Sequence, residues 1–136
     1  MVLLIDTNIL LDVLQERQKH YGDSFTIWRL CHLKEVEGHV SALSFADIVY
    51  IMRKNLNPER IEKVFDRLSK IFRFEDLKES DLKSATKMNW KDFEDAIQTV
   101  TAERIKADYI ITRNTKDFEG SKIQALTPEE YIMKIF

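Results

Sequence analysis

The sequence contains little cysteine, glycine or proline. Cys31 is the only cysteine among 136 residues, which excludes an intramolecular disulfide and predicts a reducing, cytoplasmic setting. It lies in an apolar helical stretch, where we expect a buried structural thiol and no nucleophile. With three glycines and two prolines there is no flexible linker or repeat, so we expect a single domain over residues 1–136.

Long apolar runs and an excess of one charge are also missing. No stretch approaches the roughly 20 apolar residues needed to cross a bilayer, and the start MVLLIDTN is unlike a signal peptide. A formal net charge of −2 argues against a protein that coats nucleic acid through overall basicity. It does not exclude a nuclease, because bound metal ions would cancel acidic charge at the site itself.

The sequence offers no signature of several common kinds of site. Neither GxxxxGK[ST] nor GxGxxG occurs, so a loop that cradles nucleotide phosphates is not indicated. His20, His32 and His39 show no spacing typical of metal ligands, and no Ser–His or Cys–His arrangement suggests a side-chain nucleophile.

Short apolar runs alternate with segments of helical periodicity. Helices are expected from the apolar spacing between these runs, with Gly38 ending the one over 24–35 and Ser80 capping a later one. Asn57-Pro58 and Thr127-Pro128 are typical helix starts. Strands that alternate with helices predict an α/β fold with a parallel sheet covered on both faces. The expected strands are 2–5, 39–42, 71–74, 109–112 and 122–126.

Four aspartates fall where such a sheet has its carboxyl edge. Asp6 follows the first strand and Asp117 follows the strand YIIT, while Asp47 and Asp95 lie on helices that begin at this edge. Ligands of parallel α/β sheets bind outside the carboxyl ends of the strands. Clustered carboxylates repel one another unless a cation joins them, and Mg²⁺ and Mn²⁺ prefer oxygen ligands. The sequence therefore predicts a metal-dependent enzyme that acts on phosphate esters.

Each acid also has a structural explanation. Asp47 and Asp95 would be stabilised in first turns of helices, Asp92 is a natural N-cap, and Asp6 and Asp117 could close turns. Their joint placement on one edge favours a site. Other polar residues near this edge could support the acids: Thr7, Asn8, Asp92, Thr112 and Asn114. Arg113 and Lys116 could contact a phosphate or remain solvated surface charges.

Two long segments resemble a known family. DTNILLD at the start and DFEDAIQ…ADYIITRNTKDF in the C-terminal half are similar to motifs of the PIN-domain (PilT N-terminal) family, in particular its VapC-type toxins. SALSFADIVY is similar to the middle motif of the family, but less closely. Together these segments span nearly the whole chain.

The resemblance implies a three-layer α/β/α sandwich with a mostly parallel five-stranded sheet. It implies that Asp6 and Asp95 are the first and third catalytic acids and that Asp117 is the fourth, with Asn114 beside it. Asp47 stands where the family usually has glutamate, so it must approach a metal more closely or bind it through water. Asp92, three residues before Asp95, adds negative charge on the same helical face.

The implied activity is that of an endoribonuclease. One or two Mg²⁺ or Mn²⁺ ions on Asp6, Asp47, Asp95 and Asp117 would lower the pKa of a bound water, and the resulting hydroxide would attack an RNA phosphodiester. Toxins of this family usually form homodimers and are inhibited by an antitoxin protein. The apolar residues of the helices at 24–35 and 43–54 could form such surfaces or plain core.

Three other readings compete with this one. A catalytically silent PIN-like module that only binds RNA or protein would be consistent with the change at Asp47. A phospho-acceptor signalling domain also gathers aspartates around Mg²⁺, but the required spacing of acids and lysine is missing. A haloacid-dehalogenase-like phosphatase needs a second aspartate that DTN lacks.

Overall fold

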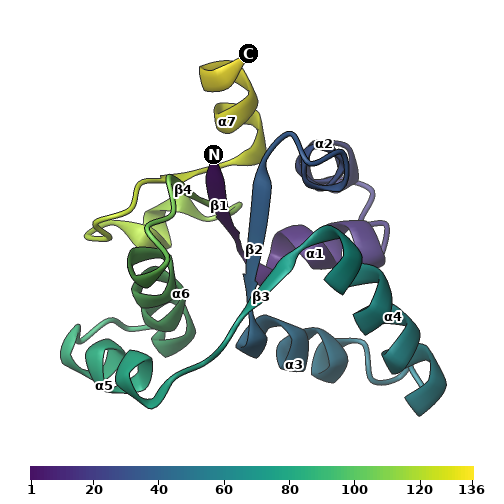
Figure 1. Cartoon of the computed structure of the whole chain (residues 1–136), viewed down its shortest axis with the longest axis horizontal. Helices are drawn as coiled ribbons and strands as arrows, with labels where there is room; N and C mark the ends of the chain where they lie inside the picture. Colours follow the sequence, from purple (N-terminus) through teal and green to yellow (C-terminus); the bar gives the residue numbers. More distant parts are fainter.

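A five-stranded sheet with β1 at its centre organises the molecule (Figure 1). The computed structural model describes all residues from 1 to 136. The strands run in the order β3-β2-β1-β4-β5, and every neighbouring pair is parallel. The predicted parallel α/β fold is therefore confirmed. The strands are β1 (Val2–Ile5), β2 (Glu37–Ser41), β3 (Arg73–Glu75), β4 (Tyr109–Ile111) and β5 (Ala125–Leu126).

The central strand is buried on both faces, which explains its continuous apolar sequence. Leu3 and Ile5 point into the larger core, whereas Leu4 packs on the opposite side with Ala102 and Ile110. Successive side chains of a strand alternate between faces, so a strand covered on both sides needs apolar residues at every position. Asp6 follows immediately, at the point where the core ends.

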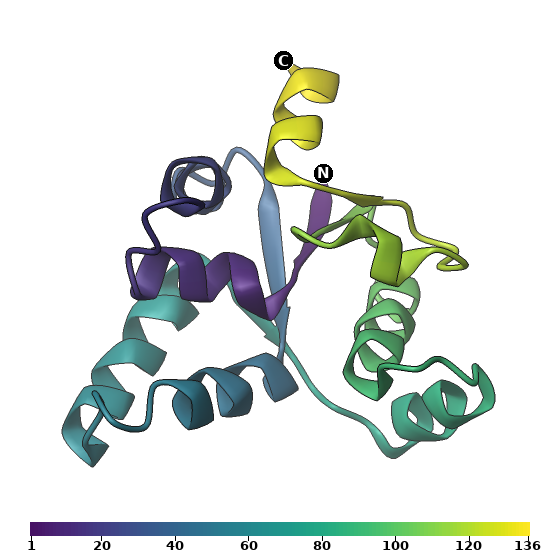
Figure 2. The same ribbon diagram turned by 180° about the vertical axis from the view of Figure 1, so that it is seen from behind.

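Helices cover the two faces of the sheet unequally (Figures 1 and 2). Helices α1 to α4 lie on the face of the larger core, and α5 and α6 lie on the other face. Helix α7 lies near both chain ends, where the Tyr131 hydroxyl donates a hydrogen bond to Met1 Sδ at 3.1 Å. The helices are α1 (Thr7–Leu14), α2 (Tyr21–His32), α3 (Ala42–Ile51), α4 (Pro58–Ile71), α5 (Glu79–Lys87), α6 (Phe93–Arg104), the 3-10 helix η1 (Thr115–Phe118) and α7 (Pro128–Ile135).

Gly38 does not end a helix, as the sequence suggested. Helix α2 ends at His32 and Gly38 lies inside β2. A Cβ atom at this position would lie 2.5 Å from Cys31 Sγ and 2.8 Å from Phe72 Cδ1. Glycine is required here because helix α2 and Phe72 pack directly against the backbone of the strand.

Some element boundaries also differ from the prediction. Helix α5 begins at Glu79 after Lys78, whose backbone N–H donates to Asp81 at 3.0 Å, so Ser80 lies inside the helix and does not cap it. Ile71 is the last residue of α4 and does not belong to a strand. The predicted N-caps Asn57, Asp92 and Thr127 are confirmed.

Cys31 is fully buried in the larger core, as expected. Burial raises the pKa of its thiol to about 12, so it stays protonated and unreactive at neutral pH. None of the helices has the length and apolar character that a membrane span requires.

Candidate active site

A pocket of about 360 Å³ opens at the carboxyl edge of the sheet, beside β1 and β4. The strand order reverses at this point, because β1 has β2 on one side and β4 on the other, and ligands of such folds usually bind at such a point. Helices α1, α3 and α6 all begin near this pocket (Figure 1). Six of its lining residues are acidic and none is lysine or arginine: Asp6, Asp47, Asp92, Glu94, Asp95 and Asp117.

Asp6 is the most buried of the six acids, with 8% of its surface exposed. Its Oδ1 accepts a hydrogen bond from the Thr7 backbone N–H at 2.8 Å, and its Oδ2 accepts one from the Thr112 hydroxyl at 2.8 Å. Burial raises the pKa of Asp6, although these two hydrogen bonds oppose the increase. Asp6 and the predicted supporting residue Thr112 thus form one rigid unit that joins the ends of β1 and β4.

The first turn of α6 brings three acids to the pocket. Asp92 is the N-cap, and its Oδ1 accepts a hydrogen bond from the Asp95 backbone N–H at 3.2 Å. The pKa of Asp95 is raised to about 7, mainly by burial and in addition by the charges of Asp92, Asp6, Asp117 and Glu94. Part of this shift therefore comes from the neighbouring acids, and no lysine or arginine lines the pocket to oppose them.

Glu94 was not identified from the sequence, although it lies between two acids that were. Its carboxyl group is hydrogen-bonded to that of Asp47, and this contact requires a proton on one of the two. Burial is the largest cause of the raised pKa of each group, and the Asp47 charge raises the pKa of Glu94 further. Asp47 lies in the second turn of α3, and not in the first turn as the sequence suggested.

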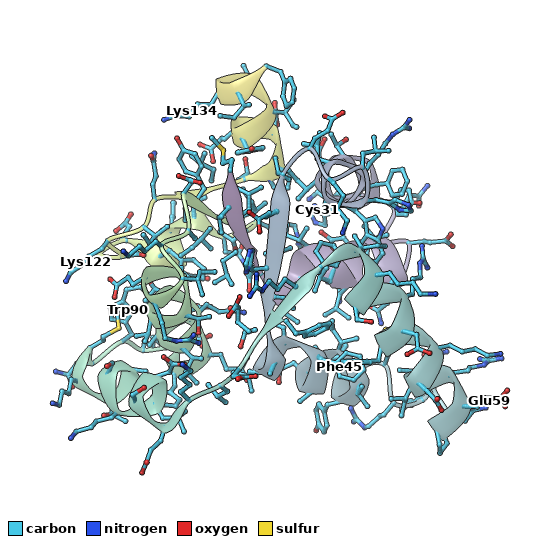
Figure 3. All side chains as sticks on the ribbon, viewed as in Figure 1. Cys31, Phe45, Glu59, Trp90, Lys122 and Lys134 are labelled. Atoms are coloured by element: carbon cyan, nitrogen blue, oxygen red, sulfur yellow. The ribbon has the colours of Figure 1, made fainter.

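Asp117 and Asn114 lie at the outer side of the pocket, in and just before η1. Both side chains are exposed, and the Asp117 backbone N–H donates to the Asn114 carbonyl at 3.0 Å. Lys116 lines an adjoining groove of about 930 Å³ that Trp90 also lines. Trp90 lies beside α6 (Figure 3). The groove shares Asp92, Glu94, Asp95 and Asp117 with the acidic pocket, so the lysine is close to the acids but does not line the pocket itself.

A buried polar chain beneath the pocket joins three helices. The Thr7 hydroxyl donates to Ser44 Oγ at 2.8 Å, and Gln98 Nε2 donates to the same atom at 3.0 Å. This chain links α1, α3 and α6 at the point where they carry the acids. Ser44 and Gln98 were missed because each looks like an ordinary polar residue on a helix. Asn8 lines the pocket and accepts a hydrogen bond from Arg17 Nη1 at 3.3 Å.

Arg113, a candidate for phosphate binding, is paired inside the protein. Its Nε lies 3.1 Å from Asp12 Oδ2, and Asp12 is fully buried. Asp12 also accepts a hydrogen bond from the Ser24 hydroxyl at 2.8 Å and lies 3.5 Å from Arg17 Nη1. The sequence analysis did not single out Asp12, because it looks like one acid on an amphipathic helix.

The PIN-domain family profile matches residues 2–116, which include five of the six acids of the pocket, and ends one residue before the sixth, Asp117. The chain belongs to the PIN-domain family. The resemblance predicted from the sequence is therefore confirmed, and PIN domains are a family of nucleases. Among curated protein sequences, no match was found.

Solved structures of toxin–antitoxin proteins share the fold. A toxin–antitoxin complex from Klebsiella pneumoniae is 24% identical, with a TM-score of 0.69 over 92% of this chain and 96% of that one. VapBC-1 from nontypeable Haemophilus influenzae is 18% identical, with a TM-score of 0.70 over 95% and 99%. VapC20 from Mycobacterium tuberculosis, described as a sarcin-ricin loop cleaving toxin, is 14% identical, with a TM-score of 0.63 over 79% and 86%. The predicted sandwich is confirmed, with a sheet that is entirely parallel.

The pocket of this PIN domain fits a divalent cation by its donor chemistry. Its ligand atoms are carboxylate oxygens, which hard cations prefer, and the pKa values of four of the acids are raised, mainly by burial and in part by the negative charge of neighbouring acids. No three acidic, histidine or cysteine side chains are already gathered closely enough to hold an ion. The carboxylates therefore have to turn towards a common point when an ion binds.

Proposed function

We propose that this PIN domain is a metal-dependent endoribonuclease that hydrolyses RNA phosphodiesters. The observation that carries the proposal is the pocket with six carboxylates and no lysine or arginine. A purely structural set of helix caps would not need to converge on one pocket. A site that binds an anion would be expected to have at least one lysine or arginine side chain, and this pocket has none. A phospho-acceptor signalling domain would require a lysine in the pocket, and none lines it.

Asp6, Asp47, Asp95 and Asp117 would hold one or two Mg²⁺ or Mn²⁺ ions. A bound ion would lower the pKa of a water molecule and neutralise charge on the scissile phosphate. The protein contributes orientation: Thr112 and the Thr7 backbone hold both oxygens of Asp6 in place.

Glu94 would compensate for the short side chain of Asp47. The two carboxyl groups are in contact from opposite helices, so either can carry a ligand oxygen while the other holds it in position. Release of the proton that they share would provide a second negative charge for a cation.

The RNA substrate and the role of a toxin are supported by the structural neighbours. VapC20 is described as a toxin that cleaves the sarcin-ricin loop, and several other neighbours are complexes of a toxin with its antitoxin. We propose that this chain is likewise the toxin of a pair, with an antitoxin protein as partner, and that it forms a homodimer. Analytical ultracentrifugation of the purified chain tests the dimer, and a small gene for a DNA-binding protein directly upstream would support the antitoxin.

A catalytically silent PIN module that binds RNA or protein is the second candidate. It is favoured by the observation that no ready group of three metal ligands exists and by aspartate at position 47 in place of glutamate. The two candidates differ in one respect that can be measured, because only the enzyme needs a metal ion.

The test combines calorimetry with RNA cleavage. The wild-type protein should bind Mn²⁺ and cut single-stranded RNA, and Asp95→Asn should reduce cleavage by about a thousandfold or more while the fold survives. Asp66→Asn is the matched control, because Asp66 is an exposed aspartate of α4 outside the pocket. A wild-type protein that binds RNA but neither binds Mn²⁺ nor cuts RNA would establish the silent module.

A further inference from the structure

Tyr50 stands exposed at the edge of the acidic pocket. It is the ninth of the ten residues of α3, lines the pocket together with Ile51, and has 65% of its surface accessible to solvent. It belongs to none of the apolar clusters of the core and contacts no other aromatic ring, unlike Phe45 on the same helix. The fold therefore gives no reason of its own for an aromatic residue at this position.

Arg53 holds the Tyr50 ring from one side. Its guanidinium carbon lies 4.2 Å from the centre of the ring, and its Nη1 donates to the Tyr50 backbone carbonyl at 2.7 Å. No acidic side chain lies within ion-pair distance of Arg53, so its positive charge is unpaired. An exposed aromatic ring and a free cation thus lie together beside a pocket whose charged lining residues are all acidic.

A strand of RNA cannot be held by the acidic pocket alone, because its phosphates are repelled by the carboxylates. It needs contacts beside the pocket, and proteins that bind single strands commonly combine aromatic rings, on which bases stack, with cations that contact phosphates. Tyr50 and Arg53 supply both. On the other side of the pocket, beside α6, Trp90, Lys91 and Lys116 line the adjoining groove together with five acids, and these three residues offer a place for the strand to continue.

We propose that Tyr50 and Arg53 form a subsite for one unpaired nucleotide beside the cleaved bond, with the base on the Tyr50 ring and the phosphate on Arg53. This inference rests on the proposed ribonuclease function. The two residues position the substrate and take no part in the chemistry. They would bind the base through its flat face, so the subsite favours unpaired over paired nucleotides.

Steady-state cleavage of a short unstructured RNA, with Mn²⁺ present, tests the subsite. Tyr50→Ala should raise KM by roughly 5- to 150-fold, the range expected for loss of one stacked base, while kcat changes less than about twofold. Tyr50→Trp should keep the wild-type KM, because tryptophan also presents a flat ring. Arg53→Gln should raise KM and weaken its dependence on salt concentration.

Two control variants match these changes outside the pocket. Arg60, like Arg53, is exposed and donates to a backbone carbonyl, that of Asn55, but it does not lie over the Tyr50 ring. Phe136 is an aromatic residue with 74% of its surface exposed, far along the chain at the C-terminus. Arg60→Gln and Phe136→Ala should leave KM unchanged.

Removing single bases from the RNA locates the contact. An abasic nucleotide at the position that stacks on Tyr50 should raise the KM of the wild-type protein, and Tyr50→Ala should then cause no further increase. If wild type cuts RNA but Tyr50→Ala leaves KM unchanged, the subsite is refuted and the ribonuclease stands. If Tyr50→Ala instead changes only the mass of the particle in solution, Tyr50 belongs to a contact between copies of the chain, which also refutes the subsite. If wild type neither binds nor cuts RNA, both proposals are wrong.

Discussion

Both aspartates of the segment DTNILLD are buried, but the groups around them carry charges of opposite sign. Asp12 is fully buried and lies against Arg113, Arg17 and the Ser24 hydroxyl, so its charge is balanced inside the protein. Asp6 is nearly as buried, but the acidic groups of the pocket surround it. Burial of an acid is therefore no guide to function by itself, and what distinguishes the two is the charge of their neighbours.

The difference assigns distinct tasks to the two ends of helix α1. At its start, Asp6 belongs to a set of acids that lacks a cation, which an ion from solution can supply. Near its end, Asp12 fixes Arg113, the residue next to Thr112, and thereby holds the segment that follows β4. The ion pair of Asp12 therefore stabilises the segment that holds Asp6 in position.

The largest effect on stability is expected at Asp12. Asp12→Ala removes the partner of two arginines and of Ser24, and should lower the free energy of unfolding by about 3 kcal/mol. Asp6→Asn should change it by less than about 1 kcal/mol, because the amide oxygen can still accept from the Thr7 N–H and the amide NH2 can donate to the Thr112 hydroxyl in place of accepting from it. Urea unfolding of both variants measures the difference, and equal losses would contradict the contrast between the two sites.

The acidic pocket should make stability depend on pH and on metal. The pKa of Asp95 is about 7 in the folded protein, against 3.8 for the isolated group, so ionisation is penalised by folding. Below about pH 4 this carboxyl group makes its full contribution to the stability of the fold, and that contribution is lost as the pH rises to about 7. Without metal, we expect the free energy of unfolding to decrease by about 1–2 kcal/mol over this range. This is less than the energy that corresponds to the full pKa shift, because Asp95 is only half-buried.

Divalent cations should reverse this loss. Thermal unfolding at several pH values, with EDTA and with Mg²⁺, measures both effects, and stabilisation by Mg²⁺ should grow between pH 5 and about 7 as protons stop competing for the carboxylates. Stability that does not change with pH, or the same Mg²⁺ effect at pH 5 and pH 8, would show that the acids are already balanced within the protein.

The smallest effect is expected at Glu94. Glu94→Gln keeps the size of the side chain and its hydrogen bond to Asp47 but removes one negative charge, so Mn²⁺ affinity should fall by about tenfold. Glu103→Gln is a control on the same helix, because Glu103 does not line the pocket. Calorimetry that finds identical Mn²⁺ affinity in wild type and Glu94→Gln would exclude Glu94 from the site.

Local sequence signals predicted the architecture well. Asn57, Asp92 and Thr127 cap helices as expected because N-capping depends on a few neighbouring residues. The role of Gly38 was predicted wrongly because it depends on close contacts with Cys31 and Phe72, which lie outside its own strand. The role of a glycine at a close approach depends on tertiary packing, whereas a cap can be read from adjacent residues.

The site was predictable in part for the same reason. The edge of the sheet brings Asp6, Asp47, Asp95 and Asp117 to one pocket, and that edge follows from the alternation of strands and helices. Glu94 and Asp12 were missed because their importance depends on which side chain each one meets across the fold. Their partners come from other elements, and no periodicity within their own helices indicates them.

The three helices that begin at the pocket affect whether the protein can fold before it binds a metal ion. Each helix start carries about half a positive elementary charge, so α1, α3 and α6 partly offset the repulsion among the acids before any ion arrives. The chain should therefore be able to complete its folding in the absence of metal and acquire the ion afterwards. Under the proposed metal-dependent mechanism, newly made protein would be inert until it binds a divalent cation, and the onset of its activity would follow metal supply more closely than synthesis.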